Sequence, residues 1–199
     1  MVAQNAVVQV DFPSQLELVK VYGFPSETKG GTVLVRFNDI YADDEKGILI
    51  KFKSRLPVKE KIAFSCKMKY TNAKDFEQVT AEKQLTVDPA TDTTAINQSK
   101  NVLVDEMIAL YESTEAFEEI LTDVDDGNYD RAKIKADAAI QVLRAKQKYL
   151  PSEKLKKQEE NLSSYSKEME HVKAMRETEK KIYQKLNKSA NYSIKKGKE

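Results

Sequence analysis

The stretch from Ala95 to Leu150 decides the fold that we expect for this chain. It reads AINQSKNVLVDEMIALYESTEAFEEILTDVDDGNYDRAKIKADAAIQVLRAKQKYL. In its first half, mostly apolar residues recur in steps of four and three positions, which places them along one face of a helix. The residues on this face are Leu103, Met107, Leu110, Thr114, Phe117, Leu121 and Val124. The pattern predicts an amphipathic helix that packs in a bundle.

The break in this stretch lies at Asp125-Asp126-Gly127-Asn128. Gly127 is suited to the left-handed conformation that ends many helices, because it has no Cβ atom. The side-chain oxygen of Asn128 is expected to cap the next helix by accepting a hydrogen bond from a backbone amide. So short a turn makes the two helices antiparallel, and the sequence predicts an αα-hairpin over about residues 95–150. The second helix carries an alanine-rich stripe that allows close packing: Tyr129, Ala132, Ala136, Ala139, Leu143 and Leu150.

A third helical segment follows Pro151, a residue that ends one helix and is tolerated in the first turn of the next. We expect one long polar helix over about residues 152–190, with a heptad-like apolar seam. This helix either packs on the hairpin as part of a bundle or projects and pairs with a partner helix. The seam supplies four candidate partner-binding residues: Tyr165, Met169, Val172 and Tyr183.

The chain before residue 90 has the alternation of apolar and polar residues that is typical of half-buried β-strands. Six or seven such strands, joined by tight turns, predict an antiparallel β-sandwich or an open barrel. The clearest strand has lysines among the residues of one face and these apolar residues on the other: Ile62, Phe64, Cys66, Met68 and Tyr70.

The change from strands to helices falls at residues 88–92, Asp-Pro-Ala-Thr-Asp. Proline resists continuing a strand, and Asp92 or a neighbouring threonine is a good cap for the helix that follows. We therefore expect an α+β chain, with an antiparallel β-sandwich domain at residues 1–90 and a helical domain at residues 91–199. The alternative is one α+β unit in which the helices pack on the sheet.

Composition bounds the function and the location. The net charge of the 199 residues is +1 at pH 7, so no overall field favours nucleic acid or membrane. Cys66 is the single cysteine, which rules out an internal disulfide and fits a reducing compartment. No apolar run approaches the ~18 residues of a membrane-spanning helix, and the first residues lack the features of a signal peptide. We expect a cytoplasmic protein.

The residue types that most reactions need are scarce. His171 is the single histidine, and it lies in the polar helical segment, where we expect no nucleophile and acid beside it. One histidine and one cysteine are too few for a typical zinc site. Gly30-Gly31 is not followed by the Gly-Lys-Ser/Thr of a phosphate-binding loop. The sequence predicts no enzyme activity, no metal site and no cofactor.

Two acidic clusters have oxygen ligands of the kind that calcium prefers, but neither has the spacing of an EF-hand loop. The first consists of Asp39, Asp43, Asp44 and Glu45, and we interpret it as a solvated turn. The second consists of Asp123, Asp125 and Asp126 near the end of a helix, where the helix dipole disfavours negative charge. A cation or a basic partner would relieve that conflict.

A lysine-rich region near the end of the chain supports a different class of function. Basic residues interleaved with Tyr183 and Tyr192 have the chemistry that binds single-stranded nucleic acid or an anionic membrane. Glu177 and Glu179 interrupt the run, so a solvated helix face is the simpler interpretation. The lysines are Lys180, Lys181, Lys185, Lys188, Lys195, Lys196 and Lys198.

Several segments of the chain resemble the region that follows the von Willebrand factor A (VWA) domain in many VWA-containing proteins. They are LVKVYGFP at residues 18–25, FNDIY at 37–41 before the acidic loop, GILIKF at 47–52, Met68-Lys69-Tyr70, and Gly127-Asn128-Tyr129. The resemblance covers roughly residues 6–150. It implies an accessory sandwich and helical module, without the VWA domain itself. The Asp-x-Ser-x-Ser metal motif of VWA domains is absent, so their metal site is not carried over.

Taken together, these features predict a non-catalytic scaffold or protein-interaction module. Its working surfaces would be the exposed edges of the sandwich and the seam on the third helix. Its partner would be a protein, with a VWA domain as one candidate, and the third helix would also allow self-association. No small-molecule substrate is evident. The alternative function is an adaptor that binds nucleic acid or an anionic membrane through the lysine-rich region.

Overall fold

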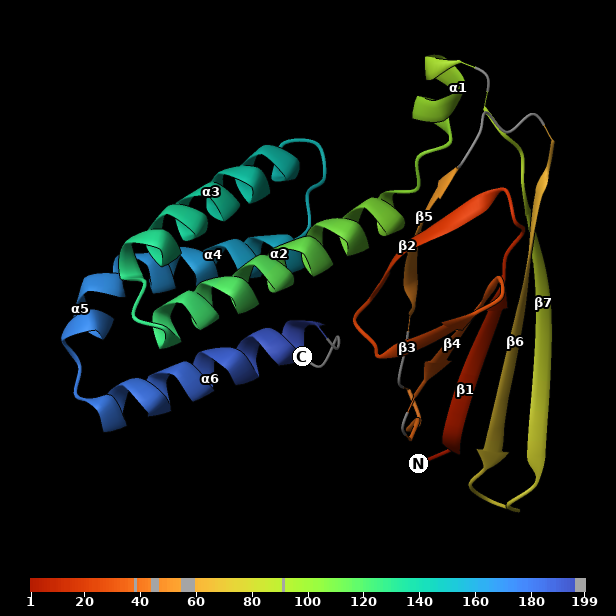
Figure 1. Ribbon diagram of the computed structural model, residues 1–199, viewed down its shortest axis with the longest axis horizontal. Coiled ribbons are helices and arrows are strands. Elements are labelled where there is room, and N and C mark those ends of the chain that lie inside the picture. Colours follow the sequence, from red (N-terminus) through yellow and green to blue (C-terminus); the bar gives the residue numbers. More distant parts are fainter. Residues whose placement is uncertain (38, 44–46, 55–59, 91, 196–199) are drawn as a thin grey trace. The chain divides into compact units, whose positions relative to one another are not determined.

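The computed structural model describes residues 1–37, 39–43, 47–54, 60–90 and 92–195. The chain divides into two compact units, Met1–Ser99 and Lys100–Glu199. The first unit contains all the described strands and one short helix, and the second contains the remaining helices (Figure 1). The predicted α+β class is therefore confirmed.

The described strands form two antiparallel sheets. The larger sheet has five strands in the order β3-β4-β1-β6-β7, and the smaller sheet pairs β2 with β5. Figure 1 shows β7 at the outer edge of the larger sheet. The strands are β1 (Ala3–Asp11), β2 (Leu16–Tyr22), β3 (Ser26–Lys29), β4 (Thr32–Arg36), β5 (Leu49–Ser54), β6 (Ile62–Asn72) and β7 (Gln78–Val87).

The two sheets pack through apolar rows on facing strands, as the alternation predicted. Phe52 of β5 contacts Phe12 at the end of β1 and Phe64 of β6, with ring centroids 4.9 and 5.4 Å apart. Strand pairing extends the same row across the larger sheet, because Val8 of β1 lies opposite both Val35 of β4 and Met68 of β6. The sandwich is unequal, since two strands face five.

The helical run that was predicted to begin at Ala95 is interrupted. A short helix, α1 (Thr93–Gln98), is capped by the Asp92 carboxylate, which accepts a hydrogen bond from the Ala95 amide at 2.8 Å. The long helix α2 (Val102–Asp125) begins only after Asn101, whose side-chain oxygen accepts from the amides of residues 103 and 104. The second cap starts a new helix axis, so the prediction of one uninterrupted run is wrong at this point.

The αα-hairpin is confirmed, with one exception at its turn. Gly127 has φ +78° and ends α2 as predicted. The next helix, α3 (Tyr129–Gln147), starts after Asn128, but the Asn128 side chain makes no capping hydrogen bond. Asn128 has φ −86° and ψ 55°, not the extended conformation that points a cap at the following amides, so this predicted cap is wrong. Ala132 and Ala136 are fully buried.

The single long helix expected at 152–190 is three helices. They are α4 (Glu153–Lys167), α5 (Met169–Ala174) and α6 (Glu177–Lys195). The first break is at Glu168, and the second is at Met175, which has an extended backbone with ψ 149°. Met175 is half-buried against the core of the unit, so the breaks let the polar segment fold back and bury its apolar side chains.

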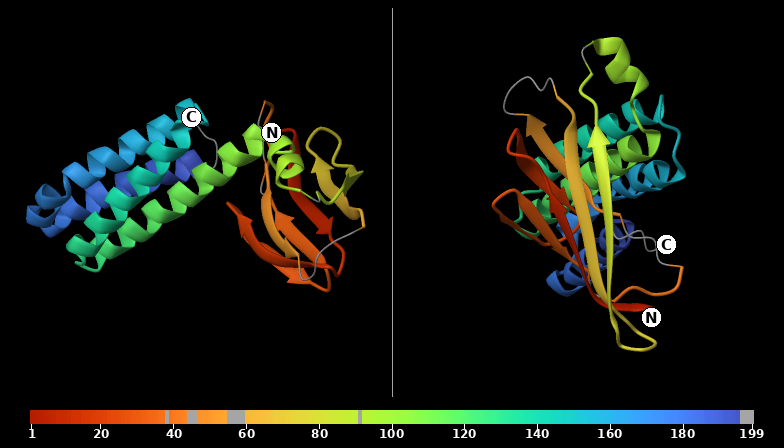
Figure 2. Two further views of the ribbon diagram at one scale, coloured as in Figure 1. Left: turned by 90° about the horizontal axis from the view of Figure 1, so that it is seen from above. Right: turned by 90° about the vertical axis from the view of Figure 1, so that its right-hand side faces the viewer.

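Helices α2, α3, α4 and α6 lie side by side around one apolar core (Figure 2). Phe117 and Tyr165 meet at its centre edge to face, with ring centroids 5.2 Å apart. Among the described residues, no helix is both long enough and apolar enough to cross a membrane.

Candidate functional site

The four predicted partner-binding residues do not form an exposed seam. Tyr165, Met169 and Val172 are completely or almost completely buried in the helical core, and Tyr183 is half-buried against it. The interpretation in which this segment packs on the hairpin holds, and the one in which it projects is wrong. The cause is apolar burial, because α4, α5 and α6 fold back on α2 and α3 and thereby remove these side chains from water without a partner.

The two tyrosines have structural roles. The Tyr165 hydroxyl donates to Gln184 Oε1 at 2.7 Å, and its ring stacks on Tyr183 with centroids 5.8 Å apart. The Tyr183 hydroxyl donates to Glu168 Oε2 at 2.6 Å. Burial raises the pKa of both phenols above the ordinary value of 10, so both remain neutral hydrogen-bond donors.

A layer of buried polar side chains holds α6 to the other helices. Gln184 Nε2 donates to the Leu121 carbonyl at 3.2 Å and to Asp125 Oδ1 at 3.0 Å. Asn191 Nδ2 donates to the Thr114 carbonyl at 2.8 Å, and Asn191 Oδ1 accepts from Gln158 at 3.2 Å. Sequence reasoning missed this layer because Gln and Asn are usually exposed. A signal was present, since Gln158 is three residues after Leu155 and four before Leu162, on the same apolar stripe.

Two of the three carboxylates in the acidic cluster at the end of α2, those of Asp123 and Asp125, form ion pairs within the chain. Arg131 and Lys135 pair with Asp123, the latter at 3.1 Å, and Lys188 pairs with Asp125. The hydrogen bond from Arg131 is the main cause that lowers the pKa of Asp123. Basic residues of α3 and α6 therefore relieve the conflict with the helix dipole. The other acidic cluster lies partly outside the described residues, at Asp44 and Glu45.

No arrangement for catalysis or metal binding comes together in the described part of the chain. His171 is exposed on α5, and Cys66 is a half-buried free thiol on β6. Nowhere among the described residues do three His, Cys, Asp or Glu side chains gather as ligands of one metal ion.

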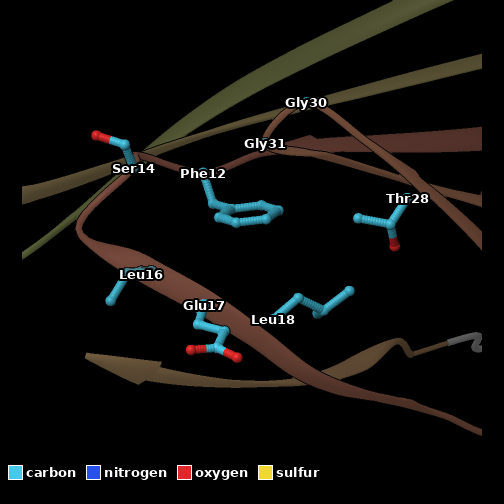
Figure 3. Close-up of a pocket in the computed structure, with 8 residues that line it drawn as sticks. All are labelled: Phe12, Ser14, Leu16, Glu17, Leu18, Thr28, Gly30 and Gly31. Atoms are coloured by element: carbon cyan, nitrogen blue, oxygen red, sulfur yellow. The ribbon is translucent and has the colours of Figure 1, made fainter. Parts of the chain in front are cut away.

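One cavity of about 390 Å³ lies in the sandwich, between β2 and the turn that joins β3 to β4. Figure 3 shows the side chains of Phe12 and Leu18 in this space, below Gly30 and Gly31. A ligand site normally has a few polar groups that converge on the ligand. The apolar side chains that line the cavity are Phe12, Leu16 and Leu18, and the polar ones are Ser14, Glu17 and Thr28. We assign no ligand to this space.

The clearest exposed feature of the sandwich is the outer edge of its large sheet. On the apolar face of the sheet, exposure is low in the inner strands and high at β7: Val33 of β4 is 0% exposed, Val8 of β1 7%, and Leu85 of β7 60%. The opposite edge strand, β3, is also exposed, but it has only four residues and none is apolar. Strand β7 spans ten residues, of which nine are exposed and Val79 is half-buried. Because β2 and β5 are the only described strands of the second sheet, its cover stops short of β7.

The comparisons with known proteins give a distant structural similarity. No protein-family model matches the chain, and no curated protein matches it significantly. The structure is similar to that of the ArnB paralog VWA2 from Sulfolobus acidocaldarius, with a TM-score of 0.43 and 13% sequence identity. The similarity covers 84% of this chain and 42% of that chain, so this chain spans less than half the length of the protein it matches.

Proposed function

We propose that this chain is a non-catalytic protein-interaction module and that β7 is the surface that binds its partner. One observation carries the proposal: the apolar row of the large sheet continues onto β7, where Leu85 and Val87 are 60% and 42% exposed. An edge strand that is long and carries apolar residues is a template for pairing with another chain. Natural proteins usually shorten, bulge, cover or charge such an edge. Strand β7 is long and exposed, and Lys83 is the one charge in its apolar row, so we take this edge as the binding site.

The helical unit also supports β7 as the binding surface, because the surfaces predicted on the helices are already used within the unit. Its seam residues are buried or half-buried inside the unit, which removes one of the two predicted binding surfaces and leaves the edges of the sandwich. Three lysines of its lysine-rich region are also engaged: Lys180 pairs with Glu177, Lys188 with Asp125, and Lys195 with Glu118. These ion pairs reduce the free positive charge that binding to nucleic acid or to an anionic membrane would need. The alternative adaptor function therefore gains no support from the described residues.

We further infer that the module is an accessory region of a VWA-type protein. The support is the sequence resemblance at residues 18–25, 37–41 and 47–52, which includes most of β2 and most of β5 of the sandwich. A VWA domain is then the first partner to test. Isothermal titration of the full chain with VWA domains encoded in the same genome tests this identity. Binding with a 1:1 stoichiometry supports it, and the absence of binding to all of them refutes it.

The role of β7 is tested by two substitutions on opposite faces of the same strand. Leu85→Lys places a charge in the apolar row, whereas Gln84→Lys places the same charge on the polar face, opposite Ser65. Affinity-tagged full chains are expressed in the source cells, and co-purified proteins are quantified. We expect the amount of the specific partner that co-purifies to fall at least about tenfold with Leu85→Lys and to stay unchanged with Gln84→Lys. Equal retention by both variants would refute β7 as the binding surface.

A further inference from the structure

We propose that the partner adds a β-strand to β7, and that this strand places a carboxylate opposite Lys83 within an otherwise apolar row. The inference rests on the proposed function, because it assumes that β7 is the binding surface. It adds the chemistry of the partner: an extended segment that alternates polar and apolar residues and carries Asp or Glu at one central position of its apolar face.

The backbone of β7 is suited to strand addition. Strand β6 is its only hydrogen-bonded neighbour among the described strands, and the two pair in continuous register from Ile62–Val87 to Thr71–Gln78. Every second residue of β7 therefore directs its N–H and C=O groups away from β6. A partner strand satisfies these groups with main-chain hydrogen bonds, which give affinity without dependence on the partner's sequence.

The side chains of β7 specify the two faces of the added strand. The row that continues the interior of the sandwich consists of Val79, Ala81, Lys83, Leu85 and Val87. The other row is polar throughout and consists of Gln78, Thr80, Glu82, Gln84 and Thr86. Residues directly opposite each other on neighbouring strands have Cβ atoms about 5 Å apart, so each row selects residues of its own kind. The partner strand is therefore apolar on one face and polar on the other.

Lys83 is the exception in the apolar row. It lies opposite Cys66, with Ala81 and Leu85 as its neighbours on the same face of β7. Within the described part of the chain Lys83 makes no ion pair, whereas Lys67 on the polar face pairs with Glu82 of β7. An unpaired cation in an apolar row is favourable only when it is hydrated or faces an anion. When a partner strand covers the row and removes water, a carboxylate opposite Lys83 provides that anion.

A second copy of this chain fits the edge less well. A two-fold axis perpendicular to the sheet pairs residues of the same row with each other. The two antiparallel registers with the longest overlap are centred on Lys83 and on Glu82. The first places Lys83 opposite its own copy, and the second does the same for Glu82, and like charges directly opposite each other are destabilising. The charge pattern therefore disfavours self-pairing and favours a different, acidic strand.

The test uses two synthetic peptides and the full chain. Both peptides are nine residues long and alternate valine and threonine, with a central valine replaced by glutamate in one and by lysine in the other. Each reads the same in both directions, so the orientation of pairing does not affect the comparison. Binding is measured by fluorescence anisotropy, and hydrogen exchange of the chain locates the site. The chain is used as wild type, Lys83→Glu and, as a control on the polar face, Gln84→Glu.

The expected result is slower exchange of the β7 amides and about fivefold to tenfold tighter binding of the glutamate peptide than of the lysine peptide. Lys83→Glu is expected to reverse this preference, and Gln84→Glu to leave it unchanged. Equal binding of both peptides to a protected β7 overturns the carboxylate at Lys83 and leaves β7 as the interaction edge. Binding without protection of β7, or no binding, overturns strand addition. The proposed function itself fails only if Leu85→Lys leaves the natural partner bound.

Discussion

Leu162 in the helical unit is fully buried, whereas Leu85 on β7 of the sandwich is 60% exposed. Both lie on the apolar face of a regular element, and both continue a row of apolar neighbours. The difference is in what covers that row. Four helices surround a common core from all sides, but two strands cannot cover a sheet of five. Amphipathic patterning thus marks a face that needs cover, and it does not say whether the chain or a partner supplies it.

The sharpest test of this comparison is the same substitution in both units. Leu162→Ala is expected to destabilise the helical unit by about 2–5 kcal/mol, because it leaves a cavity in a closed core. Leu85→Ala is expected to change stability by less than about 0.5 kcal/mol, because the side chain is already in water. Urea unfolding of the full chain, followed by circular dichroism, measures both. Similar losses would contradict the claim that one face is covered and the other open.

A second prediction concerns the polar layer that holds α6. Gln184→Leu is expected to cost about 1–3 kcal/mol, because the buried Tyr165 hydroxyl loses its acceptor. The double variant Tyr165→Phe/Gln184→Leu removes both partners and is expected to be more stable than Gln184→Leu alone. Lys181→Ala on the exposed side of α6 is the control, with an expected change below about 0.5 kcal/mol. Denaturant midpoints of the four proteins decide the matter, and no recovery in the double variant would refute the assigned hydrogen bond.

The turn of the hairpin gives a smaller effect. Gly127 has φ +78°, and a Cβ atom added there would meet no other atom within 4 Å. Gly127→Ala is therefore expected to lower the free energy of unfolding by about 1 kcal/mol, because alanine is strained at a positive φ. Gly127→Asn is expected to cost less, since asparagine tolerates the left-handed region better than alanine. Thermal unfolding of both variants provides the measurement, and an alanine variant as stable as wild type would contradict the prediction.

The smallest predicted effect is on stability at acidic pH. Because Arg131 and Lys135 lower the pKa of Asp123 in the folded state, the unfolded chain binds more protons near the ordinary aspartate pKa of about 3.9. This contribution to stability is present above that pH and is lost as the pH falls toward the lowered folded pKa. Asp123→Asn is expected to destabilise the chain at neutral pH. Between pH 5 and pH 3, the free energy of unfolding of this variant is expected to fall less than that of the wild type. Urea midpoints across this range test it, and parallel curves for both proteins would refute it.

Much of the fold followed from local patterns. The three-and-four spacing from Leu103 to Val124 located α2, Gly127 located the turn, and the alternation around Phe64 located β6. The helix breaks at Ser99 and at Met175 were missed, because no proline or glycine marks them. They depend on how the segments pack, and packing involves residues far apart in the chain. Asn128 failed as a cap for the same reason, since its backbone conformation is set by the whole hairpin.

The candidate binding surface was harder to predict than the fold. An apolar seam on a charged helix has the same sequence pattern whether it packs on its own hairpin or on a partner, and Tyr165, Met169 and Val172 do the former. The strand at β7 was predicted, but its position at the edge was not. That position depends on which strands pair, and pairing joins residues that are distant in sequence, such as β1 with both β4 and β6.

The sequence by itself determined the class of the chain, the type and approximate place of most elements, and the scarcity of catalytic residues, because these depend on local spacing and composition. Only the tertiary structure decided which apolar faces are covered and which polar residues are buried. Burial is a property of neighbours in space, and a hydrophobic residue gains the same free energy from any apolar surface that excludes water. The apolar pattern is therefore the same for Tyr165, which the chain itself buries, and for Leu85, which it leaves exposed.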